Sequence, residues 1–243
     1  MRRFLRMLFY GTLILIGIGV YFAKKNKKDE VKGNGTVSIE QRDVLPFNAI
    51  RVSGAFEVVL NQGDTYSVEV ETDGNLQENI VAEVHDEVLE IQTTGNIGNF
   101  SRMKVVVTSA AYNKVHTSGG VSLSSGTQLN GESLEIKASG ASKVNLNVMM
   151  ESIHTDFSGA GDVTLSGEAG VTTVDISGAG KLKAFELKTH EMSISISGAG
   201  YAEVNTDQKL DVNVSGAGKV RYKGNPAEVK ENISGAGVVE AEG

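Results

Sequence analysis

Two aspartates are the residues whose type and spacing come nearest to a reactive arrangement. Asp156 and Asp175 each stand two positions before the serine of a recurring Ser-Gly-Ala-Gly motif. If the chain makes one turn per motif, these carboxylates lie one turn apart, roughly 5 Å. Two carboxylates at that separation can bind a cation or shift each other's pKa. More often such a pair belongs to a solvated face, and Asp162 lies elsewhere on the expected surface, so no catalytic residue is assigned.

The other chemistry-bearing residues do not converge. The four histidines fall at different positions of the repeat, which argues against a shared metal site; they are His85, His116, His154 and His190. The stretch GAGDV at 159–163 is similar to a calcium-binding repeat, but its aspartate occurs in one copy only. The stretch GAGKLK lacks the Lys-Ser/Thr pair of a phosphate loop. With no cysteine, neither a thiolate metal site nor a disulfide is available, and we expect no cofactor.

The motif itself recurs at a nearly constant interval and predicts the fold. Full copies begin at Ser158, Ser177, Ser197, Ser215 and Ser234, and degenerate copies begin at Ser118 and Ser139, with 18 to 21 residues between successive serines. A fixed period near 20 residues is typical of a solenoid. Around each copy, apolar and polar residues alternate, which indicates strands with one buried face. The sequence therefore predicts an all-β parallel β-helix with rungs of ~19 residues.

Each motif is predicted to be a structural corner rather than a ligand loop. Its first glycine permits a positive φ or a close backbone approach, its alanine fits inside the bend, and its serine hydroxyl bonds to the turning backbone or to the next serine. The predicted corner residues are Ser158, Gly159, Gly161, Ser177, Gly178, Gly180, Ser197, Gly198, Gly200, Ser215, Gly216, Gly218, Ser234, Gly235 and Gly237.

One outward position of the repeat alternates in charge. Six residues after the serine of successive copies stand Lys183, Glu203, Arg221 and Glu240. Opposite charges on adjacent strands attract by a few tenths of a kcal/mol. The alternation therefore supports stacking in this register.

Residues 36–117 precede the repeat and lack the corner motif, although they are rich in strand patterns. Their alternation breaks at Gly54, at Gln62-Gly63 and at Asp73-Gly74. Two interpretations are open: further, less regular rungs, or a small β cap over the first edge of the solenoid. We divide the chain into residues 1–23, a polar linker 24–35, this β-rich part 36–117 and the repeat 118–243.

The N-terminus carries the pattern of a membrane segment. Residues 7–23 are free of charge and flanked by basic residues on both sides. As a helix they would span roughly 25 Å, enough for a bilayer core. We predict a transmembrane anchor, with a cleaved signal peptide and a buried core helix as the alternatives. Because both flanks are basic, charge leaves the orientation open; the kind of domain that follows favours an exported body.

The negative net charge of the chain after position 30 argues against a nucleic-acid partner. After position 30 the chain has 16 basic and 28 acidic residues. An acidic surface repels phosphates. We therefore expect no nucleic-acid partner.

Several segments in order carry a family resemblance. FNAIRVSGAFEVVLNQGDTYSVEVETDGNLQENI, EVLEIQ, KVVVTSAAYNKVHTSGG and the recurrent SGAG resemble the putative auto-transporter adhesin head (GIN) domain family over residues 37–243. The resemblance implies a right-handed parallel β-helix, exported and membrane-associated in the envelope of Bacteroidetes-type bacteria, with a proposed role in adhesion. It supplies no catalytic or binding residues. Many members look like lipoproteins, whereas this chain lacks the cysteine for that anchor.

Together these observations predict a non-catalytic binding or adhesion module. Its body would stand in the periplasm, tethered to the inner membrane by residues 7–23, or would be exported to the cell surface. The expected ligand is a glycan or an envelope protein. The second interpretation is a structural or assembly role as a homo-oligomer, and the third is an enzyme acting on polysaccharide, because parallel β-helices also host such enzymes.

Overall fold

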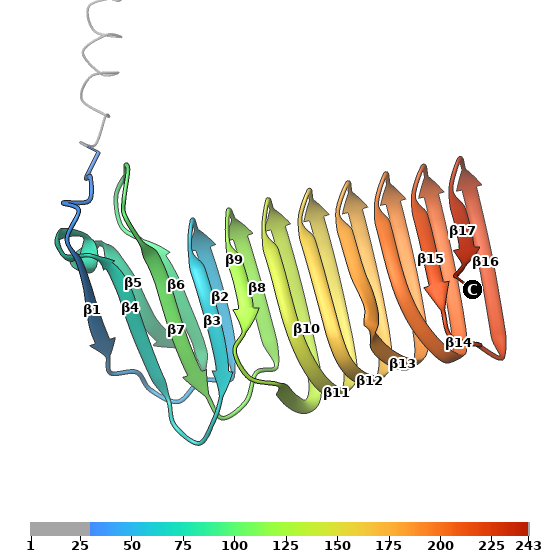
Figure 1. Ribbon diagram of the computed structural model, residues 1–243, viewed down its shortest axis with the longest axis horizontal. Coiled ribbons are helices and arrows are strands. Elements are labelled where there is room, and N and C mark those ends of the chain that lie inside the picture. The colour runs from blue at the N-terminus through green and yellow to red at the C-terminus, as the bar shows by residue number, and fades with distance from the viewer. Residues whose placement is uncertain (1–29, 243) are drawn as a thin grey trace, which may run out of the picture.

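The protein is an all-β solenoid, described in a computed structural model over residues 30–242 (Figure 1). One 17-stranded sheet winds along the rod. The predicted anchor at 7–23 and the first residues of the linker lie outside the described residues. Within residues 30–242, no helix has both the length and the apolar character needed to cross a membrane.

The strands fall into an irregular N-terminal set and a regular C-terminal set. The first set is β1 Val37–Arg42, β2 Ala49–Gly54, β3 Glu57–Gln62, β4 Ser67–Asp73, β5 Ile80–His85, β6 Val88–Thr93, β7 Met103–Ser109, β8 Lys114–Gly119 and β9 Ser122–Ser125, with one short 3₁₀ helix, η1 Gly74–Asn79. The second set is β10 Leu129–Gly140, β11 Lys143–Gly159, β12 Asp162–Gly178, β13 Lys181–Gly198, β14 Tyr201–Gly216, β15 Lys219–Lys223, β16 Glu228–Gly235 and β17 Val238–Ala241.

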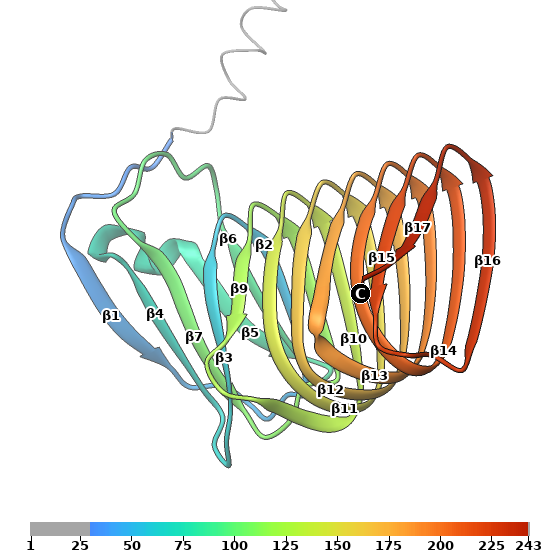
Figure 2. The ribbon, with the colours of Figure 1, turned by 45° about the vertical axis from the view of Figure 1, so that its right-hand side comes forward.

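The second set confirms the predicted rungs. From β8 onward successive rungs pair in parallel and in sequence order, and the serines of neighbouring motifs lie opposite one another from Ser118 to Ser234. Between corners the strand bends continuously around the rod, as Figure 2 shows for β11 to β14. The alternating apolar residues fill one core, where Val163, Val174 and Leu182 are fully buried.

The first glycine of each full motif makes the corner that the sequence predicts. These glycines have φ between +105° and +123°, a region that side-chain-bearing residues rarely adopt. A Cβ at any of them would lie 2.5–2.8 Å from the carbonyl oxygen of the glycine one rung earlier. Both the turn and the close stacking of the corners therefore require glycine.

The second glycine and the alanine exchange the roles that we expected. The alanines of the five full motifs are exposed, so the prediction that they lie inside the bend is wrong. The second glycine is the inward residue, because a Cβ on Gly200 would lie 2.7 Å from the Cγ2 of Ile176 and 3.0 Å from that of Ile196. The branched residues Ile176 and Ile196 thus fill the space that Gly200 leaves empty.

The N-terminal part contains an unrecognised corner. Ser53 and Gly54 lie opposite Ser118 and Gly119 in register, and Gly54 has φ +122°. The statement that residues 36–117 lack the corner is therefore wrong at this place. In this rung the inward residue after the corner is large, because Phe56 is buried where the full motifs have their second glycine.

This early rung is also out of sequence order. The strands β2 and β3 lie between the β6–β7 rung and the β8–β9 rung, in parallel with both. The segment 63–113 leaves the coil, returns one rung further out and then rejoins it at β8. Residues 36–117 thus supply further rungs, which was the first of the two open interpretations.

The same part supplies the cap, which was the second interpretation. The strands β1 and β5 pair antiparallel with β4 and β6, and β4 pairs antiparallel with β7. Together with η1 they cover the N-terminal end of the core, where Leu76 is fully buried. Asp73 holds this cap to the entering chain, because its buried carboxylate accepts hydrogen bonds from the backbone N–H groups of Gly35 and Ser101, each at 2.7 Å.

Candidate functional site

A shallow polar groove runs along the rod beside the corners. We call it the corner groove and define it by two outward columns, the motif serines and the residues two positions before them. The first column is Ser53, Ser118, Ser139, Ser158, Ser177, Ser197, Ser215 and Ser234; the second is Arg51, His116, Lys137, Asp156, Asp175, Ser195, Asn213 and Asn232. Two hollows of about 290 and 280 Å³ lie along it, at its C-terminal and N-terminal ends.

The N-terminal end of the corner groove is a charged cluster centred on Glu135. This carboxylate lies 2.6 Å from Lys137, 3.2 Å from His116 and 3.8 Å from Lys114. The hydrogen bond from Lys137 lowers the pKa of Glu135, and the same bond raises the pKa of Lys137. Burial lowers the pKa of His116, so its imidazole is mainly neutral at pH 7. Lys114 and His116 lie on β8 and Glu135 and Lys137 on β10, so the cluster links two neighbouring rungs and retains a net positive charge.

The middle of the groove carries the two aspartates singled out in the sequence. Asp156 and Asp175 lie directly opposite each other on β11 and β12 and are half-buried, which confirms their placement one rung apart. Among residues 30–242 neither has an ion-pair partner within 4.0 Å, and no three acidic or histidine side chains gather there as a metal site would need. The pair is free to accept hydrogen bonds from a ligand.

The C-terminal half of the groove is small, neutral and polar. Ser195, Asn213 and Asn232 follow one another on β13, β14 and β16, and the amide of Asn232 donates to the carbonyl of Asn213 at 3.4 Å. The floor between the two columns is apolar and formed by Ile176, Ile196 and Val214. This stretch offers hydroxyl and amide groups in a row without a fixed charge.

The serine column does not form the hydroxyl ladder that we considered. Ser139 donates to the backbone oxygen of Thr117, on the preceding rung, at 3.2 Å, so the expected bond to the backbone of its own corner is not formed either. The serines of the five full motifs are exposed, and within the described part of the chain their hydroxyls have no protein partner. Their donors and acceptors are therefore available to a ligand.

The histidines remain apart, as the sequence predicts. His116 belongs to the Glu135 cluster, whereas His85 and His190 pair with Glu83 and Asp207 at 3.4 and 3.0 Å. His154 lies two positions before Asp156 on the same strand. No two of the four share a partner in the described residues.

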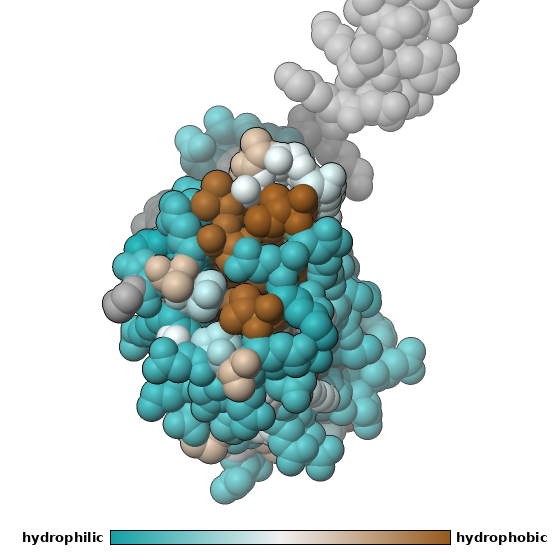
Figure 3. All heavy atoms as spheres, turned by 90° about the vertical axis from the view of Figure 1, so that its right-hand side faces the viewer, coloured by the Kyte–Doolittle hydropathy of each residue, from teal (hydrophilic) through white to brown (hydrophobic). Residues whose placement is uncertain are grey.

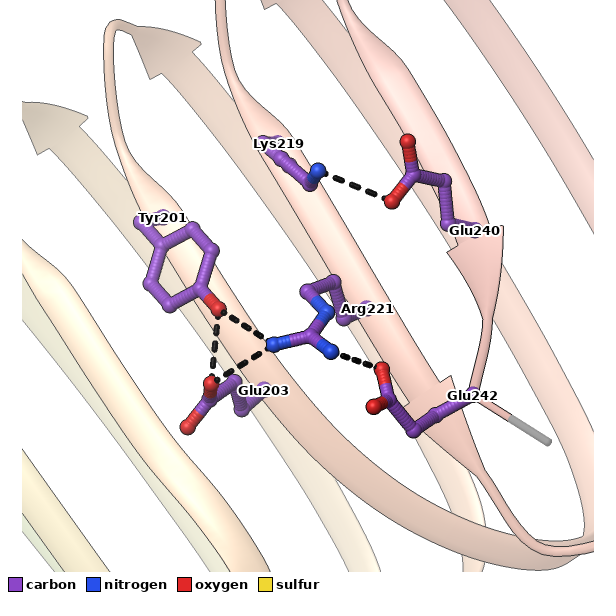
Figure 4. A network of polar contacts seen from close by, with 6 residues as sticks. All are labelled: Tyr201, Glu203, Lys219, Arg221, Glu240 and Glu242. Carbon is purple, nitrogen blue, oxygen red and sulfur yellow. Dashed lines mark hydrogen bonds and ion pairs between the residues drawn. The ribbon is translucent and has the colours of Figure 1, made fainter.

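The strand face beyond the corner holds a self-contained polar network (Figure 4). The guanidinium of Arg221 contacts the carboxylates of Glu203, at 3.4 Å, and Glu242, and Tyr201 donates to Glu203 at 2.6 Å. Lys219 pairs with Glu240 at 2.8 Å. The predicted attraction between stacked neighbours is confirmed for Arg221 and Glu203, while Glu240 pairs diagonally instead. Because these groups pair with one another, we expect the network to stabilise the fold rather than to bind a ligand.

Comparisons with known proteins identify the class. Residues 46–226 match the family described as "Putative auto-transporter adhesin, head GIN domain", and the chain belongs to that family. No curated protein matches the chain.

Solved structures of bacterial proteins share the fold. A putative adhesin from Bacteroides fragilis is 22% identical with a TM-score of 0.83 and covers 87% of this chain. Putative adhesins from Parabacteroides distasonis and Parabacteroides merdae are 31% and 27% identical, with TM-scores of 0.73 and 0.71, and each covers 88% of this chain. In all three the match includes 100% of the solved chain. The fold therefore stands on its own in those crystals.

Proposed function

We propose that this protein is a non-catalytic binding module of the bacterial envelope that holds its ligand in the corner groove. The observation that carries the proposal is the row of exposed serine hydroxyls without protein partners, flanked by unpaired Asp156 and Asp175 and by small polar side chains. Rungs repeat every ~4.8 Å, so equivalent donors and acceptors recur along the rod. A repetitive ligand suits such a surface better than a compact one.

A glycan is the ligand class that these groups favour. Hydroxyl, carboxamide and carboxylate groups hydrogen-bond to sugar hydroxyls as both donors and acceptors. The groove is open and shallow, whereas sites for compact small molecules are usually concave and bury most of the ligand. Many weak contacts along a chain add up through multivalency. An envelope protein that presents an extended polar segment is the alternative ligand, and the acidic body disfavours nucleic acid.

The proposal includes placement outside the cytoplasm. Residues 7–23 have the length and composition of a membrane anchor, with a signal peptide as the alternative, and 24–35 would serve as the tether. The rod would then stand in the periplasm or at the cell surface, with the right-handed coil that the family resemblance implies. Related solved proteins are described as putative adhesins, which agrees with presentation at a surface.

Glycan binding by residues 30–243 tests the proposal. On a glycan array, followed by titration of the strongest binder, we expect weak binding that Asp175→Ala reduces several-fold. The matched control is Asp162→Ala, the same substitution at an exposed carboxylate on the other strand face, which should bind as the parent does. Absence of any binder at high protein concentration, or equal loss in both variants, would refute a glycan site in the groove.

The enzyme alternative rests on the same two aspartates. Turnover of acidic polysaccharides that Asp156→Asn abolishes would overturn the non-catalytic proposal. We expect no turnover, because paired carboxylates need a positioned partner or water to act as acid and base, and neither aspartate has an ion-pair partner among residues 30–242.

A further inference from the structure

The C-terminal end of the rod exposes the end of the hydrophobic core. Figure 3 looks onto this end and shows apolar side chains gathered between polar ones. Val229, Ile233 and Val238 are each about 40% exposed there. The columns of Val229 and Ile233 are buried in earlier rungs, for example at Leu210 and Val214, whereas Val238 follows the outward residue Lys219. Within residues 30–242 nothing pairs with the outer edges of β16 and β17. Unpaired edges and apolar ends of this kind are templates for association.

One residue in this last rung breaks the core pattern. The third position before each motif serine points inward, and its residues are Val115, Ile136, Thr155, Val174, Ile194, Val212 and Glu231. The first six are fully buried. Glu231 pairs in register with Val212 and places a carboxylate between Val229 and Ile233, where every other rung has an uncharged side chain.

The rest of the β16 edge is charged in a different way. Lys230 and Glu228 point outward and form an ion pair at 2.7 Å within the strand. They are already neutralised and remain hydrated if another strand approaches the edge. Glu231 has no such partner in the described residues, so covering the end would bury an uncompensated charge, which is costly.

We propose that Glu231 prevents this end from pairing with a second copy of the chain: its uncompensated carboxylate keeps the rods apart. The copies would meet tail to tail, because β1, β4, β5 and η1 cover the core at the opposite end. Antiparallel pairing of two β16 strands centred on Glu231 sets Val229 of each copy against Ile233 of the other. It also sets the two Glu231 carboxylates face to face. A two-fold contact of this kind closes as a dimer and cannot grow into a fibre.

The substitution Glu231→Val tests the proposal, since valine is the residue that this column already holds. We use residues 30–243, which include every residue of the described solenoid, and measure mass by light scattering during gel filtration. The parent should be a monomer and Glu231→Val a dimer of twice the mass. The control Glu228→Val adds the same apolar group and removes the same charge on the outward side of β16, and it should stay monomeric. Circular dichroism checks that each variant is folded.

The geometry of the dimer has its own readout. The chain has no cysteine, so single cysteines can be placed at either end. Glu231→Cys removes the carboxylate and lies opposite its own copy on the two-fold axis, so it should form an intermolecular disulfide. Ile39→Cys, placed in the cap of the Glu231→Val variant, should not. The proposal is overturned by a dimeric parent, a monomeric Glu231→Val, equal dimerisation of Glu228→Val, larger oligomers, or cross-linking through the cap. None of these results depends on the ligand of the corner groove.

Discussion

The two halves of the rod solve the same packing problem with opposite choices of residue. At the corner of the β2–β3 rung a small residue, Val52, precedes the serine and a large one, Phe56, follows the glycine and alanine. In the β13 rung the order is reversed, with Ile196 before the serine and Gly200 after it. In the first rung the larger inward residue follows the corner, and in the second it precedes the corner. The recurring SGAG is thus one of two solutions, and the core, rather than the motif, is what the rungs share.

The largest expected effect comes from deleting that volume in the N-terminal half. Phe56 is 2% exposed, and Phe56→Ala leaves a cavity that should cost about 3–5 kcal/mol of stability. At the equivalent position Gly200→Ala adds volume and should cost about 1–3 kcal/mol through overpacking. Chemical denaturation measures the free energy of unfolding of both variants.

The matched double variant decides whether volume is the cause. Ile176→Ala removes the methyl group that a Cβ on Gly200 would strike. Combined with Gly200→Ala, it should cost less than the two single substitutions added together. Strict additivity would show that Gly200 is needed for its backbone and not for space.

The next effect concerns the first glycine. At Gly198, φ is +122° and a Cβ would lie 2.6 Å from the carbonyl oxygen of Gly178, so Gly198→Val should cost about 3 kcal/mol or more. Gly120 is the matched control, because a Cβ there has nothing within 4 Å and the full motifs carry alanine at this place. Gly120→Ala should leave stability unchanged or raise it by about 0.5 kcal/mol. Thermal unfolding measures the change in stability of both variants.

Lowering the pH should destabilise the N-terminal cap before it affects the regular rungs. Hydrogen bonds from the backbone of Ser101 lead the causes that lower the pKa of Asp73 below its ordinary value of 3.8. A carboxyl group with a lowered pKa stabilises the fold above its ordinary pKa, and that contribution is lost as the pH falls through the lowered value. Hydrogen exchange should therefore accelerate in β1 and in residues 31–35 as the pH falls below the ordinary value of 3.8 and through the lowered pKa of Asp73, while β12 to β14 stay protected. Asp73→Asn should expose the same segments at pH 7; equal protection of cap and coil would contradict this assignment.

The smallest effect has the opposite sign. The hydroxyl of Thr155 is fully buried on β11 and has no hydrogen-bond partner in the described structure, and its column otherwise holds valine and isoleucine in the interior. Thr155→Val removes an unsatisfied polar group at constant shape and should stabilise the protein by about 1 kcal/mol. Denaturant midpoints check this value. The control Thr173→Val lies on β12 at a half-exposed outward position and should change stability little.

Sequence reasoning was strongest where the chain repeats itself. The serine spacing and the alternating apolar columns predicted the parallel pairing from β8 to β17, because every rung meets a neighbour of the same kind. It failed at Ser53-Gly54, although the letters VSGA were visible, because that rung is separated from its spatial neighbour by the strands of the cap. It also misplaced the alanine, since a sequence column does not say which of two small residues points inward.

The features of the candidate site also divide into those that the sequence predicts and those that only the structure shows. The column of Asp156 and Asp175 could be derived from spacing alone, because register carries equivalent residues to equivalent places. The convergence of Lys114, His116 and Lys137 on Glu135 could not, because it depends on how far side chains reach between and along two strands, β8 and β10. The exposure of Val229 and Ile233 was equally hidden, since in sequence they resemble every buried residue of their columns.

The sequence by itself determined the period, the alternation of buried and outward residues and the need for glycine at each corner. These are local properties, because they follow from strand geometry and from the absence of a Cβ. Only the tertiary structure decided the spatial order of the first rungs, the inward glycine and the closed and open ends of the rod. Those features depend on which segment lies beside which, and packing between residues distant in the chain sets that arrangement.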